Sequence, residues 1–253
     1  MKRITAAALA ALLTLSAPAL GQSERDENRA DAARINVRLG IEYMRNGNLA
    51  VAQDKIDKAL EQNPRDAGVQ MGAGLLYEQL RENEKAGEHY RRALRLEPDN
   101  PQIQNALGAF LCRNGEPEKG EEMFLTAAVN PLYRTPEVAY TNAGVCARRG
   151  GNLERAEEHL RRAVTAGVQY PEAMLQMAGV SYERGNYLQA RAFLQRYLSV
   201  ASGGADVLML GYQVEKALGD QVAADDYARR VQTRFPDSPE ARVLAEQSSG
   251  GGQ

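Results

Sequence analysis

The sequence contains only two cysteines and two histidines, the side chains that most often carry thiol chemistry or bind metal ions. Cys112 and Cys146 could form a disulfide, hold a metal ion, or remain as two separately buried thiols. His89 and His159 could contribute imidazole ligands to a metal ion. Which chemistry applies depends on how the folded chain places these four residues.

No catalytic motif accompanies these side chains. The sequence lacks HExxH, a Walker loop, GxSxG and a paired cysteine cluster. Its two histidines belong to no local grouping of Ser, His and Asp that could support nucleophilic catalysis. Carboxylates gather in "RENEKAGE" and "EPEKGEE", where a solvated surface is the ordinary interpretation. We therefore expect no enzyme activity, no cofactor and no metal site.

A repeat of about 34 residues organises the chain. Six glycines recur at spacings of 34, 34, 36, 35 and 32, and a second small residue follows about twelve residues after each. This pattern resembles the tetratricopeptide repeat, a helix-turn-helix unit. The resemblance covers six units over roughly residues 33 to 240. The six glycines are Gly40, Gly74, Gly108, Gly144, Gly179 and Gly211.

The repeated glycines indicate close helix packing. A glycine within a helix costs about 1 kcal/mol relative to alanine, so six at one helical position need a shared reason. Close approach of the two helices of each unit provides that reason, and stacking of units buries the apolar face that one unit cannot bury alone. We predict an all-α, right-handed solenoid of six tetratricopeptide repeats, with the first helices lining its concave side.

The predicted division of the chain follows from this repeat. A signal peptide occupies residues 1–21, a polar segment 22–32, the repeats with the end of a capping helix 33–245, and a flexible tail 246–253. The repeats span about 33–66, 67–100, 101–136, 137–171, 172–203 and 204–240.

The repeat register places the two cysteines on the first helices of adjacent units. Their positions differ by two residues, which turns one side chain by about 200° relative to the other, so they face each other. Helix axes 8 to 10 Å apart leave a Cα separation of about 5 to 6 Å, within the range of a disulfide. We predict a Cys112–Cys146 bond in preference to two buried thiols. His89 and His159 stand about 20 Å apart in this register, too far to share a metal ion.

The segment "NPLYRTPE", residues 130–137, adds two residues between the third and fourth units. Pro131 and Pro136 prevent either helix from continuing through it, so we expect a stiff, partly exposed loop. Leu132 and Tyr133 either pack this loop onto the neighbouring helices or form a contact patch for a partner.

Polar residues of the first helices suggest a binding surface. Asn105 and Asn142 are expected to point toward the concave side, where an amide can bind the backbone of an extended peptide. Asn142 could instead cap or pack the "RTPE" loop. A row of arginines near the helix ends could form a basic edge, or could serve only the helix dipole. This row comprises Arg45, Arg113, Arg149 and Arg184.

The N-terminus predicts export. A basic "MKR", an apolar run from Ile4 to Leu15 and the small residues of "APALG" are typical of a signal peptide cleaved after Ala19 or Gly21. The apolar run is too short to span a membrane. Cleavage removes two basic residues, so 31 become 29 against 33 acidic ones, and the net charge of −2 becomes −4. This balance leaves no strongly basic face for nucleic acid.

Three segments resemble one family. "FLCRNG", "NPLYRTPE" and "NAGVC", in this order and behind an export signal, resemble the type IV pilus biogenesis and stability proteins of the PilF/PilW family. The resemblance implies a periplasmic scaffold at the outer membrane that helps the pilus secretin, its protein partner, to reach its place or assemble there. We expect the chain to be a monomer. A tetratricopeptide adaptor of another envelope machine is the alternative. Family members are commonly lipoproteins, but Gln22 stands where their lipid-bearing Cys is expected, so a lipid anchor is not predicted.

Overall fold

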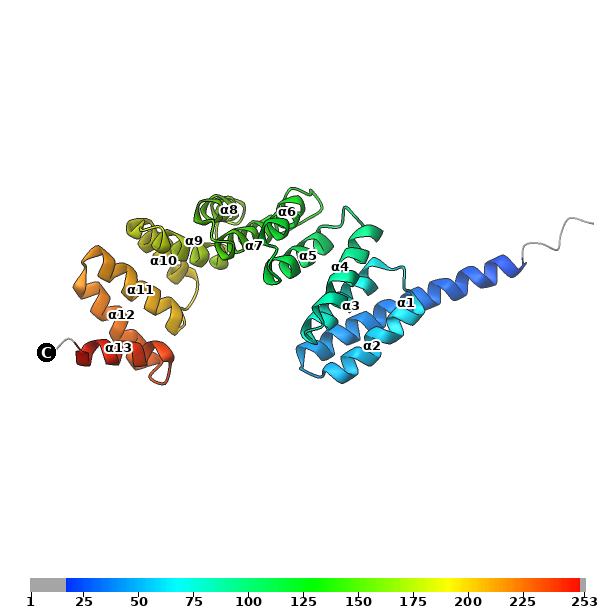
Figure 1. The fold of residues 1–253 in the computed structure, drawn as a ribbon, viewed down its shortest axis with the longest axis horizontal. Helices are drawn as coiled ribbons and strands as arrows, with labels where there is room; N and C mark the ends of the chain where they lie inside the picture. The colour runs from blue at the N-terminus through cyan, green and yellow to red at the C-terminus, as the bar shows by residue number, and fades with distance from the viewer. Residues whose placement is uncertain (1–16, 251–253) are drawn as a thin grey trace, which may run out of the picture. The chain divides into compact units, whose positions relative to one another are not determined.

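The computed structural model describes the backbone of residues 17–250 and the side chains of residues 23–247. The described residues form thirteen α-helices and no strand (Figure 1). Most of the predicted signal peptide, residues 1–16, lies outside the described residues. The helices are α1 Ala17–Arg45, α2 Leu49–Gln62, α3 Ala67–Gln79, α4 Asn83–Leu96, α5 Pro101–Arg113, α6 Pro117–Ala128, α7 Pro136–Arg149, α8 Leu153–Ala166, α9 Pro171–Glu183, α10 Tyr187–Val200, α11 Ala205–Leu218, α12 Gln221–Arg234 and α13 Pro239–Gly250.

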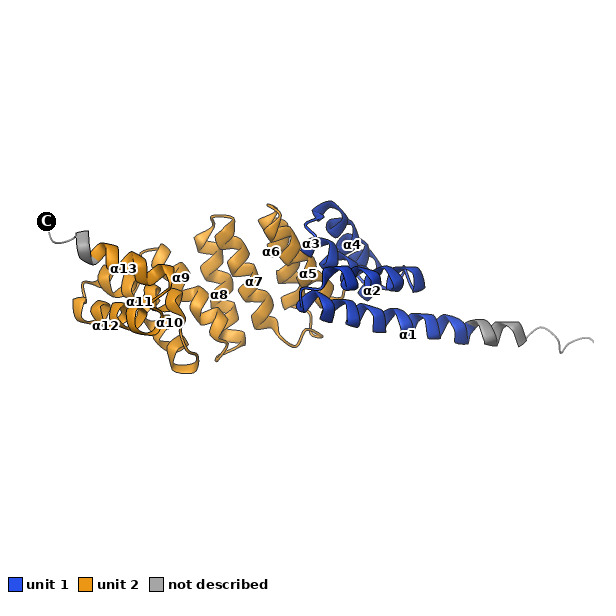
Figure 2. Cartoon of the chain, turned by 90° about the horizontal axis from the view of Figure 1, so that it is seen from below, with its two compact units in different colours: residues 1–98 blue, residues 99–253 orange. Residues whose placement is uncertain are grey.

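The chain divides into two units (Figure 2). Met1–Pro98 forms the N-terminal unit with α1 to α4, and Asp99–Gln253 forms the C-terminal unit with α5 to α13. Within each unit, every odd-numbered helix up to α11 packs against the helix that follows it. The first helices of consecutive pairs also contact each other. In the N-terminal unit α1 contacts α3, and in the C-terminal unit α5 contacts α7, α7 contacts α9, and α9 contacts α11. The predicted all-α arrangement of tetratricopeptide helix pairs is confirmed.

The glycines of the repeat lie where helices come close together. A Cβ on Gly108 would lie 2.9 Å from the carbonyl oxygen of Gly120, and one on Gly120 would lie 2.7 Å from that of Gly108. Two small residues therefore face each other across α5 and α6, as the sequence predicts. Gly179 differs, because a Cβ there would lie 3.3 Å from the guanidinium of Arg148, which belongs to the preceding repeat.

Short turns join the two helices of each pair. A residue with positive φ lies in each turn, and it is glycine in every pair except the second, where Arg81 has φ 62°. Asparagine or aspartate side chains then cap several of the helices that follow, as Asn48 does for the N–H of Val51 and Asn152 for that of Arg155. The turn residues fix where each second helix begins.

The two ends of the described chain are helical. Helix α1 begins at Ala17, so the polar segment predicted at 22–32 belongs to a helix that continues into the first repeat. Helix α13 ends at Gly250, so the helix extends into the segment from residue 246 for which a flexible tail was expected. Among the described residues, no helix is both long and apolar enough to cross a membrane.

Candidate protein-binding surface

The predicted site residues gather on or beside the first helices of the C-terminal unit. We call the exposed side of α5, α7, α9 and α11 the first-helix surface. Contacts between corresponding residues show that α5, α7 and α9 run in the same direction. Asn105 meets Asn142 near the middle of α5 and α7, Cys112 meets Cys146 toward their ends, and Arg148 meets Glu183 at the ends of α7 and α9. The helix-turn-helix repeat gives α11 the same direction.

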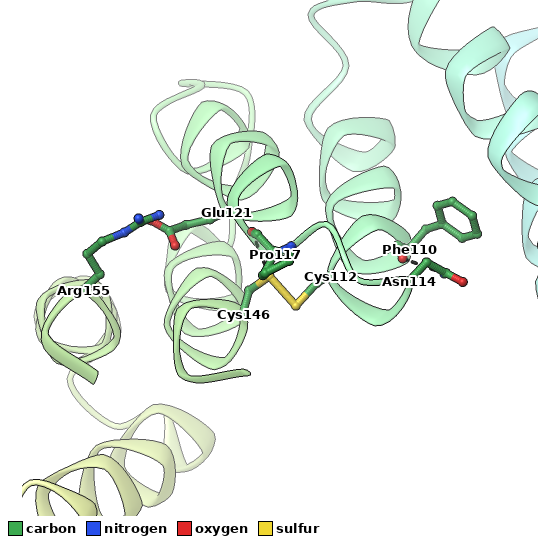
Figure 3. Close-up of a disulfide and its surroundings, with 7 residues drawn as sticks. All are labelled: Phe110, Cys112, Asn114, Pro117, Glu121, Cys146 and Arg155. Carbon is green, nitrogen blue, oxygen red and sulfur yellow. Dashed lines mark hydrogen bonds and ion pairs between the residues drawn. A yellow bond between two sulfur atoms is a disulfide. The ribbon is translucent and has the colours of Figure 1, made fainter. Parts of the chain in front are cut away.

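A disulfide joins α5 to α7. Figure 3 shows the sulfur atoms of Cys112 and Cys146 bonded between the two helices. The Cα atoms of the two cysteines lie 5.7 Å apart. The bond is enclosed by protein, because Cys112 is 7% exposed and Cys146 is 0% exposed. Its Cys146 sulfur also lies 3.2 Å from the carbonyl oxygen of Pro117 in α6. The disulfide thus fixes the third and fourth repeats to each other.

The two predicted asparagines form a pair. Nδ2 of Asn142 donates a hydrogen bond to Oδ1 of Asn105, at 3.1 Å. Asn142 therefore contacts the neighbouring first helix, and its side-chain hydrogen bond among the described residues goes to Asn105, not to the "RTPE" loop. Oδ1 of Asn142 and Nδ2 of Asn105 have no hydrogen-bond partner among the described residues. One acceptor and one donor remain available on two half-buried side chains.

An arginine links α7 to α9. Nε of Arg148 lies 3.1 Å from both carboxylate oxygens of Glu183, and its Nη2 pairs with Oε1 of the same carboxylate. Nη1 of Arg148 also donates to Oε1 of Gln176 at 3.2 Å. The missing side chain at Gly179 leaves room for the guanidinium. Sequence reasoning missed this contact, because the repeat glycine suggested packing within the fifth unit only.

A hollow of about 330 Å³ is lined by residues of α9 and α11 and by Arg148 of α7. Its lining is mixed: the apolar side chains are those of Leu175, Tyr182, Val207 and Leu210, and the polar ones are those of Arg148, Gln176, Glu183, Asp206 and Gln213. The hollow is large enough for an aliphatic or aromatic side chain of a bound segment. It extends the first-helix surface beyond the asparagine pair.

The predicted arginine row is not uniform. Arg45 lies in the N-terminal unit and pairs with Glu42 at 2.7 Å, and Arg184 pairs with Glu157 at 2.8 Å. Arg113 and Arg149 are exposed at the ends of α5 and α7, and Arg149 has no ion pair among the described residues. The sequence reasoning missed Lys216, which stands in the last turn of α11.

Leu132 and Tyr133, the two apolar residues predicted to matter in the 130–137 loop, differ in burial. Tyr133 is partly buried and packs against Ala127, Ala128 and Ala139, so it attaches the loop to the adjoining helices. Leu132 is 76% exposed. Packing thus accounts for Tyr133, and Leu132 alone presents apolar surface to solvent.

A buried carboxylate corrects one sequence expectation. Glu121 of "EPEKGEE" is 4% exposed and not part of a solvated face. Its Oε1 accepts hydrogen bonds from Nε of Arg155 and Nε2 of His159, each at 2.9 Å, and Figure 3 includes its pairing with Arg155. The carboxylate is buried where α6 faces α8, because Arg155 and His159 of α8 lie against it. Charge pairing from α8 offsets the cost of removing it from water.

His89 lies in a different environment in the N-terminal unit. Its Nδ1 is 2.7 Å from Oε1 of Gln70, and its ring stacks on Tyr77 with centroids 5.3 Å apart. The pKa of His89 is lowered, mainly because burial disfavours the charged ring and further because Arg92 repels it. Among the described residues, no group of three or more His, Cys, Asp or Glu could hold a metal ion.

The lowered pKa of His89 predicts a pH-dependent stability. The unfolded chain binds a proton at this residue at higher pH than the folded chain, so acidification favours unfolding. The contribution is fully present above a pH of about 6.5 and decreases as the pH falls below it. Urea unfolding at pH 7 and pH 5 should show a smaller loss of stability in His89→Gln than in the parent chain. An equal loss in both would contradict the assignment to His89.

A further hollow, of about 610 Å³, lies in the N-terminal unit between α1 and α3. Val37 and Val69 contribute apolar surface to it, and Arg34, Arg38 and Asp66 contribute charge. Arg34 and Asp66 lie 3.7 Å apart. The sequence reasoning assigned no site here, and Gly68, which also lines the hollow, lies outside the repeated glycine series.

The fold and these surfaces define a tetratricopeptide repeat protein. A tetratricopeptide repeat family model matches residues 37–101, 111–171 and 141–206. Type IV pilus assembly protein PilF of Pseudomonas aeruginosa is 26% identical over 85% of both chains. The crystal structure of PilW, a widely conserved type IV pilus biogenesis factor, is 33% identical, covers 84% of this chain and 98% of that chain, and superposes with a TM-score of 0.78.

A solved structure of Pseudomonas aeruginosa PilF has the same fold, with 24% identity, a TM-score of 0.75 and coverage of 87% of this chain and 99% of that one. The chain belongs to the PilF/PilW family of type IV pilus tetratricopeptide repeat proteins. The family resemblance of the three sequence segments is thereby confirmed.

Proposed function

We propose that this protein is a non-enzymatic periplasmic scaffold that binds an extended segment of the type IV pilus secretin. In this role it supports assembly of the secretin or its localisation at the outer membrane, and it associates with that membrane through its partner. The names of its relatives, a pilus assembly protein and a pilus biogenesis factor, support the pathway. The export signal predicted from the sequence supports the compartment.

The asparagine pair is the observation that carries the binding mode. A peptide unit in an extended segment offers one N–H and one C=O. The free Oδ1 of Asn142 and Nδ2 of Asn105 are the matching acceptor and donor. Because the two amides hold each other and the nearby disulfide holds their helices, little side-chain entropy is lost on binding.

The other groups of the first-helix surface suit binding of a protein segment, not catalysis. Arg148 and Glu183 form an ion pair, and both line the hollow between α9 and α11 together with apolar and other polar side chains. Such a combination suits recognition of a protein segment, in which backbone contacts give affinity and pockets select side chains.

Affinity purification from envelope extract tests the proposal. We expect the full chain to recover the secretin, and Asn105→Ala/Asn142→Ala to recover at least about tenfold less, since two hydrogen bonds of about 1 kcal/mol each are lost. Asn36→Ala/Gln62→Ala is the matched control, because these side chains also form an inter-helix amide hydrogen bond, at 2.9 Å between α1 and α2.

The control should recover the secretin as the parent chain does. Deletion of the gene should also reduce secretin multimers and surface pili. Recovery of proteins from another envelope machine, with no pilus component among them, would contradict the proposal and favour the adaptor alternative.

A further inference from the structure

The charges of the first helices in the C-terminal unit are segregated by helix end. Acidic residues occupy the first turns of α7, α9 and α11, namely Glu137, Glu172 and Asp206. Basic residues occupy the opposite ends: Arg113 of α5, Arg149 of α7, Arg184 at the C-cap of α9 and Lys216 of α11. We call the first group the loop edge and the second the turn edge.

The helix dipole favours this pattern, because it stabilises acids in the first turn and bases in the last turn of any helix. The pattern is nevertheless more regular among the first helices than among the second. Helices α7 and α11 have both charges, α9 has the acid with Arg184 at its C-cap, and α5 has the base. Among the second helices of the same unit, α6 and α8 have only the acid in these turns, α12 has only the base, and α10 has neither.

The two edges differ in which of their charged side chains already form ion pairs within the protein. The other carboxylates at the turn edge are already paired, Glu183 with Arg148 and Glu215 with Arg191. Arg149 has no ion pair among the described residues, and Lys216 contacts only the ring and hydroxyl of Tyr212. At the loop edge, Asp206 is exposed and Glu172 accepts a hydrogen bond only from Gln176, at 2.8 Å. Arg184 at the turn edge is neutralised by Glu157, and the exposed Arg134 of the α6–α7 loop offsets one carboxylate at the loop edge. The net charge left by the remaining groups is positive at the turn edge and negative at the loop edge.

Because the first helices run in the same direction, each edge follows the row of helices. The strip between the edges contains the asparagine pair, and the hollow between α9 and α11 extends across it from Asp206 to Glu183. Figure 2 shows the α6–α7 loop and the α7–α8 turn at opposite ends of α7. A segment that lies along this strip therefore has negative charge on one side and positive charge on the other.

An extended segment matches this arrangement. Its successive side chains point to opposite sides, and those on one side recur about every 6.6 Å. Neighbouring helix axes are about 8 to 10 Å apart, so one side chain per side can reach each helix. Side chains directed to the turn edge would be acidic, and those directed to the loop edge would be basic.

We propose that the first-helix surface selects an extended protein segment in which acidic and basic side chains alternate, acids toward the turn edge and bases toward the loop edge. This inference rests on the proposed function, whose binding surface it specifies. It commits to a partner segment of alternating charge, with a second copy of this chain as the competing occupant.

Two synthetic decapeptides of equal composition test the inference on the full chain. In one, glutamate and lysine alternate; in the other, all glutamates precede all lysines. Fluorescence anisotropy at low ionic strength should show the alternating peptide binding at least about fivefold more tightly, because only it places opposite charges on opposite sides. Equal binding of the two peptides would overturn the inference.

Charge reversal at each edge provides the internal check. Arg149→Glu/Lys216→Glu and Glu172→Lys/Asp206→Lys should each remove the preference. All four substitutions together should restore it, because shifting an alternating peptide by one residue exchanges its two sides. Glu118→Lys/Glu154→Lys is the matched control for Glu172→Lys/Asp206→Lys: it makes the same acid-to-base change on second helices and should leave the preference intact.

Two further outcomes would overturn the inference. One is loss of the preference in the matched control. The other is sedimentation showing a dimer that both edge variants abolish, since a second copy would then occupy the surface. The secretin recovery described above is measured independently, so failure of the charge pattern with recovery intact leaves the proposed function standing.

Discussion

Removing the disulfide is expected to lower the free energy of unfolding of the full chain by about 3 to 4 kcal/mol. Cys112 and Cys146 are 34 residues apart in sequence, and a cross-link over a loop of that length restricts the unfolded chain substantially. The bond joins α5 to α7, so its loss should destabilise the C-terminal unit first.

Denaturant unfolding of the parent chain and of Cys112→Ser/Cys146→Ser, each with and without reductant, measures this effect. Reductant should lower the midpoint of the parent chain and leave that of the variant unchanged. Intact mass after denaturation should rise by two hydrogens on reduction of the parent chain. A parent chain whose mass does not change on reduction has no bond, and the prediction then fails.

The same pair of helices carries the asparagine pair, which links the disulfide to binding. Loss of the bond frees α5 to shift against α7, and the Asn105–Asn142 hydrogen bond depends on their alignment. We expect the cysteine variant to bind the secretin more weakly while it remains folded. Such an effect acts through positioning, because neither sulfur is exposed enough to contact a partner.

Periodicity explains why much of this fold could be predicted. A repeat constrains the same contact several times, so the register that aligned the six glycines also placed Cys112 opposite Cys146. Contacts that depend on single side chains were harder to predict from the sequence. The sequence put Asn105 and Asn142 on one side of the solenoid, but their direct hydrogen bond depends on an inter-helix spacing that no local pattern encodes.

The buried charges were missed for a related reason. Glu121 stands among acidic residues and was interpreted as solvated, although Glu157 occupies the same position in the next repeat and is also buried, at 8% exposure. Each follows the small residue of a second helix, Gly120 or Ala156, where neighbouring helices come closest. Comparison of the repeats position by position does not reveal this burial, because the equivalent residues include the exposed Gln53 and Asp225. Tyr133 and Leu132 could not be separated in that way, because their loop occurs once.

A bulky residue at Gly120 is expected to be as costly as loss of the disulfide. A Cβ there would lie 2.7 Å from the carbonyl oxygen of Gly108 and 3.0 Å from the backbone nitrogen of Cys112. Backbone atoms cannot turn aside as a flexible side chain can, so α5 and α6 must separate. Gly120→Val should lower the free energy of unfolding by about 3 kcal/mol, at the upper end of overpacking effects.

Glu122→Val is the matched control for this substitution. Residue 122 lies on the same helix and is exposed, so valine there changes helix propensity without meeting another helix. Its effect should remain within about 0.5 kcal/mol. If Gly120→Val costs no more than Glu122→Val, the close approach of α5 and α6 is not what this glycine provides.

The two costly changes should also be coupled. A side chain at position 120 would press on the backbone that carries Cys112, so Gly120→Val displaces one end of the disulfide. Residues in contact deviate from additivity by about 0.5 to 3 kcal/mol. A double-mutant cycle of Gly120→Val with Cys112→Ser/Cys146→Ser should therefore show a smaller combined loss than the sum of its parts, because the displaced bond no longer stabilises the parent geometry. Strict additivity would mean that α5 moves as a rigid rod and takes the disulfide with it.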